Sequence, residues 1–256
     1  MSVRIEKKGS VWTVIHSRPE AKNAMDPESA EALEQAFLEF DRDAEAAVAV
    51  LWGEGGAFCA GFDLKHAAKG SAIDQGDFSG RGPMGPTRLL LDKPVIAAVA
   101  GPAVAGGFEI ALWCDLRVME ASAYFGVYCR RWGVPLIDGG TVRLPRIVGR
   151  GRALDLILTG RKVTAEEALR INLCEYVVPE GESRARAEAL ARDIARFPQA
   201  CMRADRRSVF RQEGLSLREA MRFEWENGVP AYYAEGAAGA ARFAAGKGRG
   251  GNFGDI

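Results

Sequence analysis

Three short segments constrain the fold of this chain more than any other feature. They are AVAVLWG (47–53), KPVIAAVAG (93–101) and DLRVME (115–120), and each ends at a glycine or a charged residue. Segments of this length and apolar character are typical of strands buried in a parallel sheet, and they are too short to cross a bilayer as helices. They alternate with helical patterns, so the sequence predicts an α/β fold with a covered sheet.

The N-terminal part of the chain predicts a hairpin followed by a helix. Residues 3–17 alternate between apolar and polar side chains around Gly9, which indicates two paired strands. In the segment 26–43, Asp26 is placed as an N-cap and Pro27 as the first helical residue, and apolar residues recur at helical spacing.

The C-terminal part differs from the rest in its pattern. Helical spacing dominates over residues 182–196, 199–212 and 215–236. We therefore expect an α/β core over residues 1–195 and a helical part over residues 196–256.

The charge and cysteine content exclude several classes of function. Lys plus Arg and Asp plus Glu each number 34, so the net charge is zero and nothing indicates a nucleic-acid or membrane partner. The five cysteines form no CxxC pair and the two histidines are far apart, so neither a disulfide framework nor a metal centre is expected. The first ten residues lack an apolar signal core. We expect a cytoplasmic protein with reduced thiols.

Two glycine-containing turns follow predicted strands. In GPAVAGGFEIALWCDLRV (101–118), Gly106 and Gly107 stand where a helix begins, so free backbone N–H groups and the helix dipole favour negative charge there. In GEGGAFCAGFDLK (53–65), residues 60–63 form a similar turn. Two such turns would supply the two N–H donors that one oxyanion requires. The alternative is that the glycines only permit close packing of helix and strand.

Together with a third segment, these motifs resemble the enoyl-CoA hydratase/isomerase family, also called the crotonase superfamily. The third segment is YFGVYCRRWGVPLIDGGTVRLPRIVGRGRALDLILTGRKVTAEEALRINLCEYVVP (124–179), and the resemblance covers roughly residues 3–180 in motif order and spacing. It implies an α/β fold in which strand–strand–helix turns form a spiral, with a helical C-terminal part through which members form trimers or dimers of trimers.

The resemblance also implies a site for acyl-CoA thioesters. The backbone N–H groups of Phe62 and Gly106 would hold the thioester oxygen and stabilise an enolate, and Glu109 would act on a water or a proton as acid or base. The apolar neighbours of Glu109 would raise its pKa toward neutrality, which suits proton transfer. The alternative is a solvated or hydrogen-bonded helix acid.

One position departs from the family pattern. Hydratases of the family carry a second glutamate shortly after an FG pair, and Cys129 stands at that place here. A thiol is a poor substitute for a carboxylic acid near neutral pH. Asp138 is a candidate replacement acid, or else the N-cap of the following helix. Arg130 or Arg131 is a candidate partner for Asp138 or Glu109.

The CoA moiety needs contacts of its own. By the resemblance, two segments contact it, and the candidate residues in them are Ala21, Lys22, Ala60, Asp63, Leu64 and Lys65. The lysines would offset phosphate charge, or else be ordinary surface residues.

Two further regions bear on the site and the assembly. The Gly-, Pro- and Ser-rich segment 70–86 is expected to be a mobile loop that shapes the acyl pocket. In the C-terminal part, Phe223, Trp225 and Tyr232 are candidate apolar anchors between subunits, or else intramolecular core.

Three functional hypotheses follow. The first is hydration of a 2-enoyl-CoA through a thioester enolate, with no cofactor beyond the CoA moiety of the substrate. The second is double-bond isomerisation, or another enolate reaction, because a single carboxylate can move one proton between two carbons. The third is a non-catalytic acyl-CoA-binding protein, against which Glu109 argues, since a binder has no evident need for an acid at that position.

Overall fold

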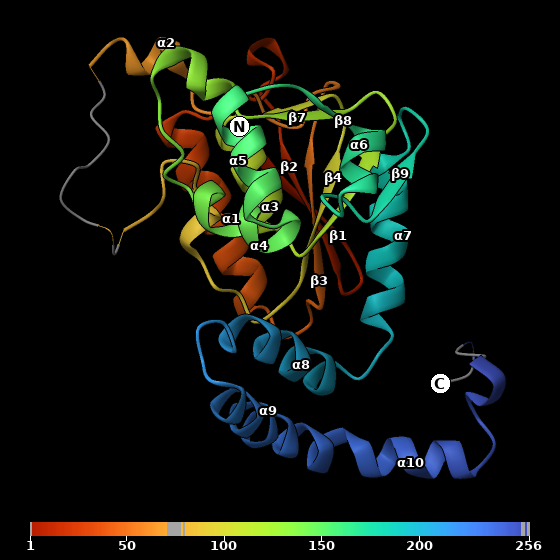
Figure 1. Ribbon diagram of the computed structural model, residues 1–256. Coiled ribbons are helices and arrows are strands. Elements are labelled where there is room, and N and C mark those ends of the chain that lie inside the picture. The colour runs from red at the N-terminus through yellow and green to blue at the C-terminus, as the bar shows by residue number, and fades with distance from the viewer. Residues whose placement is uncertain (1, 71–77, 79, 252–253, 255–256) are drawn as a thin grey trace. The chain divides into compact units, whose positions relative to one another are not determined.

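The computed structural model describes residues 2–70, 78, 80–251 and 254. The chain divides into two units, Met1–Ile194 and Ala195–Ile256. The described strands all lie in the first unit, whereas the second unit is helical (Figure 1).

A six-stranded sheet forms the centre of the first unit. Its strands, in spatial order, are β1 (Val3–Lys8), β2 (Val11–His16), β3 (Val48–Gly53), β4 (Val95–Val99), β6 (Leu116–Glu120) and β9 (Tyr176–Val178). β1 and β2 pair as an antiparallel hairpin, and every other neighbouring pair is parallel. The hairpin is confirmed, and the three segments assigned to buried strands are β3, β4 and β6, so that prediction is confirmed as well.

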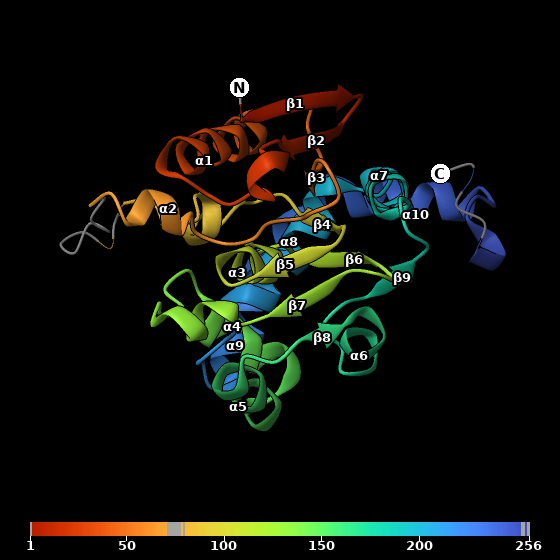
Figure 2. The same cartoon turned by 90° about the horizontal axis from the view of Figure 1, so that it is seen from above.

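A second sheet of three strands gives the fold its spiral. It comprises β5 (Pro102–Val104), β7 (Tyr124–Gly126) and β8 (Val163–Thr164). β5 follows β4 along the chain and β7 follows β6, so each passage contributes one strand to each sheet before a helix begins. The stacked turns are seen from above in Figure 2, and they confirm the spiral that the resemblance implies.

Helices close the turns of the spiral. In the first of them the Asp26 side chain accepts a hydrogen bond of 2.8 Å from the Ser29 N–H, and Pro27 is the first helical residue, so the predicted N-cap is confirmed. The helices of the first unit are α1 (Pro27–Arg42), α2 (Leu64–Ala67), α3 (Gly106–Trp113), α4 (Gly140–Val148), α5 (Arg150–Thr159), α6 (Ala165–Arg170) and α7 (Ser183–Ala195).

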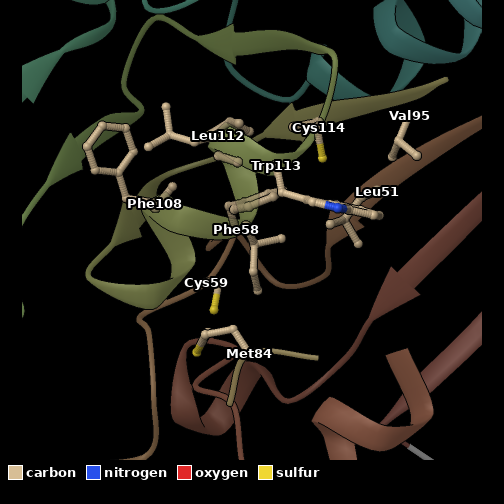
Figure 3. Close-up of a cluster of buried hydrophobic side chains, with 14 of the residues drawn as sticks. Leu51, Phe58, Cys59, Met84, Val95, Phe108, Leu112, Trp113 and Cys114 are labelled. Atoms are coloured by element: carbon tan, nitrogen blue, oxygen red, sulfur yellow. The ribbon is translucent and has the colours of Figure 1, made fainter. Parts of the chain in front are cut away.

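Helix α3 is buried along its whole length. Figure 3 shows Phe108, Leu112 and Trp113 of this helix in the hydrophobic core. The Phe108 ring stacks on Phe125 with centroids 4.7 Å apart, and Trp113 meets Phe37 edge-on at 4.9 Å. Aromatic pairs of this kind add to the stabilisation from burial, so α3 is a fixed support for any group it carries.

The second unit contains α8 (Gln199–Arg211), α9 (Leu217–Ala231) and α10 (Ala237–Ala244). Together with α7 these helices confirm the helical pattern expected of the C-terminal part. Asn227 joins α9 to α8, because its side-chain N–H₂ donates to the carbonyl of Ala204 at 2.6 Å.

Part of the apolar surface of the second unit is exposed. Trp225 is 73% exposed and Tyr232 is 64% exposed, whereas Phe223 is half-buried. Within the second unit, therefore, neither Trp225 nor Tyr232 is part of a buried core.

The described residues include no helix that is both long and apolar enough to cross a membrane, and no group of three or more His, Cys, Asp or Glu side chains placed to hold a metal ion. The five cysteines carry free thiols, four of them buried.

Candidate active site

The first of the two predicted turns joins β5 to α3. Ala105 adopts φ 54° and ψ −126°, a conformation that non-glycine residues rarely take, and its N–H is tied to the carbonyl of Gly126 at 2.8 Å. The helix begins at Gly106, so the Gly106 N–H has no intrahelical acceptor, and it has none elsewhere among the described residues. The predicted helix start is confirmed.

The two glycines at this turn have different structural roles. A Cβ on Gly107 would lie 2.2 Å from the carbonyl oxygen of Cys59, so Gly107 permits the close approach of helix and loop. A Cβ on Gly106 would meet the flexible Met84 side chain, with Sδ 2.4 Å away. The packing alternative thus accounts for Gly107 through a backbone contact, whereas the free N–H distinguishes Gly106.

The second turn lies against the first. Gly61 adopts φ +94°, and a Cβ placed on it would be 3.1 Å from the Gly106 nitrogen. Met25 pairs with this segment, because its N–H donates to Gly61 and its carbonyl accepts from Asp63, each at 2.8 Å. The N–H of the intervening Phe62 faces away from that pairing and has no acceptor in the described part of the chain. Two free N–H groups therefore come from adjoining turns.

Glu109 lies one helical turn after Gly106 and is only 2% exposed. Its Oε1 accepts hydrogen bonds from the N–H groups of Gly140 (2.8 Å) and Asp138 (2.9 Å), whereas Oε2 has no partner among the described residues. Burial raises the pKa of Glu109 to about 7, with a further rise from the Asp138 charge, against the lowering effect of the two N–H donors and Arg143. Glu109 is thus buried and hydrogen-bonded, and its pKa lies in the range that suits a proton carrier.

Asp138 does not cap the helix that follows it. Gly139 occupies the N-cap position of α4, with φ 97°, and no side chain caps the helix. The Asp138 carboxylate instead accepts hydrogen bonds through Oδ1 from the Thr87 hydroxyl (2.5 Å) and the Met84 N–H (3.1 Å). The N-cap alternative is wrong, and burial raises the pKa of this carboxyl too.

The cation near the two carboxyl groups is not one of those expected from the sequence. Arg130 donates to the carbonyl of Ile157, and Arg131 stacks over the Tyr128 ring, 4.0 Å from its centroid. Arg143 instead lies near the carboxyl groups of Glu109 and Asp138, and it donates to the Asp138 carbonyl at 2.9 Å. The proposed pairing of Arg130 or Arg131 is therefore wrong.

Cys129 lies beside Glu109 in the same cavity. Its side chain is buried, and burial together with the Glu109 charge raises the pKa of the thiol. The thiol is therefore protonated near neutral pH and carries no charge.

One cavity brings these groups together. It is bordered by Phe62, Gly106, Glu109, Cys129 and Asp138, and its remaining walls are mostly apolar, formed among others by Leu64, Pro83, Met84, Trp132, Val134 and Ile137. The segment 70–86, expected to be a mobile loop, falls partly on residues 71–77 and 79, which lie outside the described residues. Its described end supplies Pro83 and Met84 to the cavity.

Several residues of the site were missed from the sequence. Thr87 and Arg143 reach Asp138, and Tyr128 and Trp132 border the cavity. The one available signal was Arg143, a charged residue in the otherwise uncharged start of α4. The others carry no local pattern.

The candidate CoA-contacting segments lie side by side. The Ala60 N–H donates to the carbonyl of Lys22 at 3.0 Å, and the neighbouring Ala21 ends a short 3-10 turn. The Asp63 side chain caps α2 by accepting from Lys65 and His66 N–H groups.

Some of the charged groups around these segments are paired with one another, whereas two lysines are not. Arg18 is shared between Asp63 (3.2 Å) and Asp26 (3.1 Å), so the Asp63 carboxylate is already engaged. Lys22 and Lys65 are exposed, as is the side chain of Leu64, and neither lysine forms an ion pair among the described residues. The two ammonium groups are thus available to an anion.

Comparisons with known proteins agree with this geometry. The sequence profile described as enoyl-CoA hydratase/isomerase matches residues 6–236. Enoyl-CoA hydratase EchA19 of Mycobacterium tuberculosis is 36% identical over 240 residues, which cover 91% of this chain and 89% of that protein. Carnitinyl-CoA dehydratase of Salmonella arizonae is 38% identical over 224 residues, with 87% and 85% covered.

Solved structures show the same likeness. The crystal structure of enoyl-CoA hydratase EchA1 from Mycobacterium marinum superposes with a TM-score of 0.89 at 33% identity, and 95% of each chain is covered. An enoyl-CoA hydratase of Mycobacterium tuberculosis gives 0.89 at 34% identity with the same coverage.

Proposed function

The chain belongs to the enoyl-CoA hydratase/isomerase family and is an acyl-CoA-transforming enzyme of the lyase type, and within that class we propose that it adds water to a 2-enoyl-CoA. The observation that carries the proposal is the cavity shared by the buried carboxyl group of Glu109 and two free N–H groups, those of Phe62 and Gly106. Relatives named enoyl-CoA hydratase and carnitinyl-CoA dehydratase support a reaction that adds or removes water.

The chemistry follows from these groups. Ionised Glu109 takes a proton from water through Oε2 while the water oxygen forms a bond to Cβ of the enoyl thioester. The electron pair of the double bond shifts to join Cα to the thioester carbon, and the carbonyl pair moves to the thioester oxygen, where the N–H groups of Phe62 and Gly106 stabilise the negative charge. Glu109 then returns its proton to Cα, which closes the reaction with the carboxylate restored.

Isomerisation is the second candidate, and Cys129 favours it. A neutral thiol stands where hydratases carry a second glutamate, so Glu109 has no second acid at that position. Glu109 could take a proton from Cα of a 3-enoyl-CoA and return it two carbons away through the same enolate.

The remaining assignments rest on position. We propose that Ala21, Lys22, Ala60, Asp63, Leu64 and Lys65 contact the CoA moiety, mainly through backbone groups and the two lysines, and that no other cofactor is needed. The exposed Trp225 and Tyr232 support assembly into a homotrimer or a dimer of trimers, which sedimentation equilibrium would test. The free thiols support a reducing compartment, the cytoplasm.

The test is the absorbance of the conjugated enoyl-thioester band. Wild-type protein should remove the band of a 2-enoyl-CoA, and Glu109→Gln should do so at least about 100-fold more slowly. Growth of the band from a 3-enoyl-CoA, with 2-enoyl-CoA unchanged, would instead establish the isomerase. Binding of both esters without any change in absorbance would overturn both reactions and leave an acyl-CoA-binding protein.

A further inference from the structure

Two buried carboxyl groups border one cavity, and the backbone of one residue forms a hydrogen bond to the carboxyl group of the other. Glu109 and Asp138 are 2% and 4% exposed. The Asp138 N–H donates to Glu109 Oε1, so the residue that carries the second carboxyl group also holds the first one in place.

The Asp138 side chain is itself anchored to a distant part of the chain. Thr87 and Met84 both donate to Oδ1, and a Cβ on Gly82 would lie only 2.6 Å from that atom. Arg143 connects the segments that contain Asp138 and Thr87 through their backbones. Its guanidinium group donates to the carbonyls of Asp138 (2.9 Å) and Thr87 (2.7 Å). Oδ1 is therefore enclosed and fully used in holding the loop.

The charges around the two carboxyl groups are unequal. Glu109 faces Asp138, the neutral thiol of Cys129 and the guanidinium of Arg143. Asp138 faces Arg143 and, in addition, Arg88. Because Asp138 is also the more acidic side chain in water, it is the member of the pair that stays ionised when only one negative charge is present.

We propose that Asp138 is a positioning residue for Glu109: its carboxylate anchors the loop whose N–H holds Glu109 Oε1, and its negative charge adds to the effect of burial in raising the pH at which Glu109 gives up its proton. This inference rests on the proposed role of Glu109 as proton carrier. It differs from the expectation that Asp138 replaces the missing second glutamate and exchanges a proton with the substrate itself.

The experiment is a titration of the Glu109 carboxyl group by ¹³C NMR in protein labelled at Glu and Asp carboxyl carbons, with the resonance assigned by its loss in Glu109→Gln. Asp138→Asn keeps an oxygen that accepts from Thr87 and Met84 but removes the charge. It should lower the Glu109 midpoint by about one pH unit. Thr87→Val, the matched control, removes one bond of the anchor but keeps the Met84 bond, the two Arg143 bonds and the charge, and should leave the midpoint within about 0.3 unit of wild type.

Activity gives the second readout. The acidic limb of kcat/KM should move with the NMR midpoint in Asp138→Asn, and kcat on the plateau should fall no more than about tenfold, because a direct proton carrier would cost 100-fold or more. An unmoved midpoint, or a larger loss of kcat with the limb unmoved, overturns the proposal.

Two further safeguards keep the test decisive. If Asp138→Asn does not fold, the Asp138 resonance of the wild-type protein decides. Its chemical shift should change once when Asp138 itself ionises and a second time at the Glu109 midpoint. A titration curve with a single step would contradict the proposal. If wild-type protein turns over neither enoyl-CoA, the proposed function fails, whereas the titration still decides this inference.

Discussion

The backbone N–H of Asp138 donates a hydrogen bond of 2.9 Å to Oε1 of Glu109. With the Gly140 N–H on the same atom, this bond fixes one oxygen of the carboxyl group and leaves Oε2 for chemistry. The carboxyl group is rigid in position yet able to exchange a proton, which is what a group that moves a proton between water and carbon requires.

The activity should depend on the ionisation of Glu109. Because Glu109 is ionised at the start and at the end of the proposed cycle, kcat/KM should fall tenfold per pH unit below about pH 7, where its pKa lies. Hydration and the reverse dehydration should show the same limb, since their ratio is a pH-independent equilibrium constant. Initial rates from pH 5 to 9 check this, and a flat profile would contradict it.

Folding stability should decrease as pH rises, whereas activity should increase. Between the ordinary Glu pKa of 4.5 and about 7, the folded protein keeps a proton on Glu109 that the unfolded chain has lost. The free energy of unfolding therefore falls as pH rises through that window, by about 3 kcal/mol in total. Glu109→Gln should remove this loss and be more stable than wild type at pH 8, with no gain at pH 4. Urea unfolding measures it, with exposed Glu45→Gln as the control.

Strain at Ala105 should be measurable. A non-glycine residue at φ 54° and ψ −126° costs of order 1–3 kcal/mol, whereas glycine adopts this conformation freely. We expect Ala105→Gly to raise the free energy of unfolding by about 1 kcal/mol after its own entropic cost. Ala105→Val should lower it. Unfolding curves in which Ala105→Gly is less stable than wild-type protein would show that the turn is not strained.

Cys129 should not be a nucleophile. Its thiol is buried beside Glu109 and stays protonated, so Cys129→Ala and Cys129→Ser should keep kcat within about threefold of wild type. Steady-state rates for both variants decide the point. A loss above 100-fold in each would give the thiol a chemical role.

Local patterns in the sequence were sufficient to predict the framework. Strand length and hydrophobicity located β3, β4 and β6, and Asp26 with Pro27 located the start of α1, because these features depend on neighbours along the chain. The free N–H of Gly106 was predictable for the same reason, since it follows from the strand-to-helix turn in which it lies.

The surroundings of Asp138 could not be predicted in this way. An aspartate before Gly-Gly-Thr has the local features of an N-cap, yet Gly139 takes that place, and the carboxylate turns to Thr87, 51 residues earlier in the chain. Likewise Arg130 and Arg131 are near the site in sequence, whereas Arg143 is near it in space. Contacts across the spiral depend on the fold as a whole.

The most direct test of the account is exchange of the Cα protons of a saturated acyl-CoA in D₂O, followed by NMR. It requires only that the two turns stabilise the enolate and that Glu109 moves the proton, and it is indifferent to whether the full reaction is hydration or isomerisation. We predict deuterium at Cα with wild-type protein and a loss of at least about 100-fold in exchange rate with Glu109→Gln. Equal exchange by both proteins, or none by wild type while the ester is bound, would contradict the account.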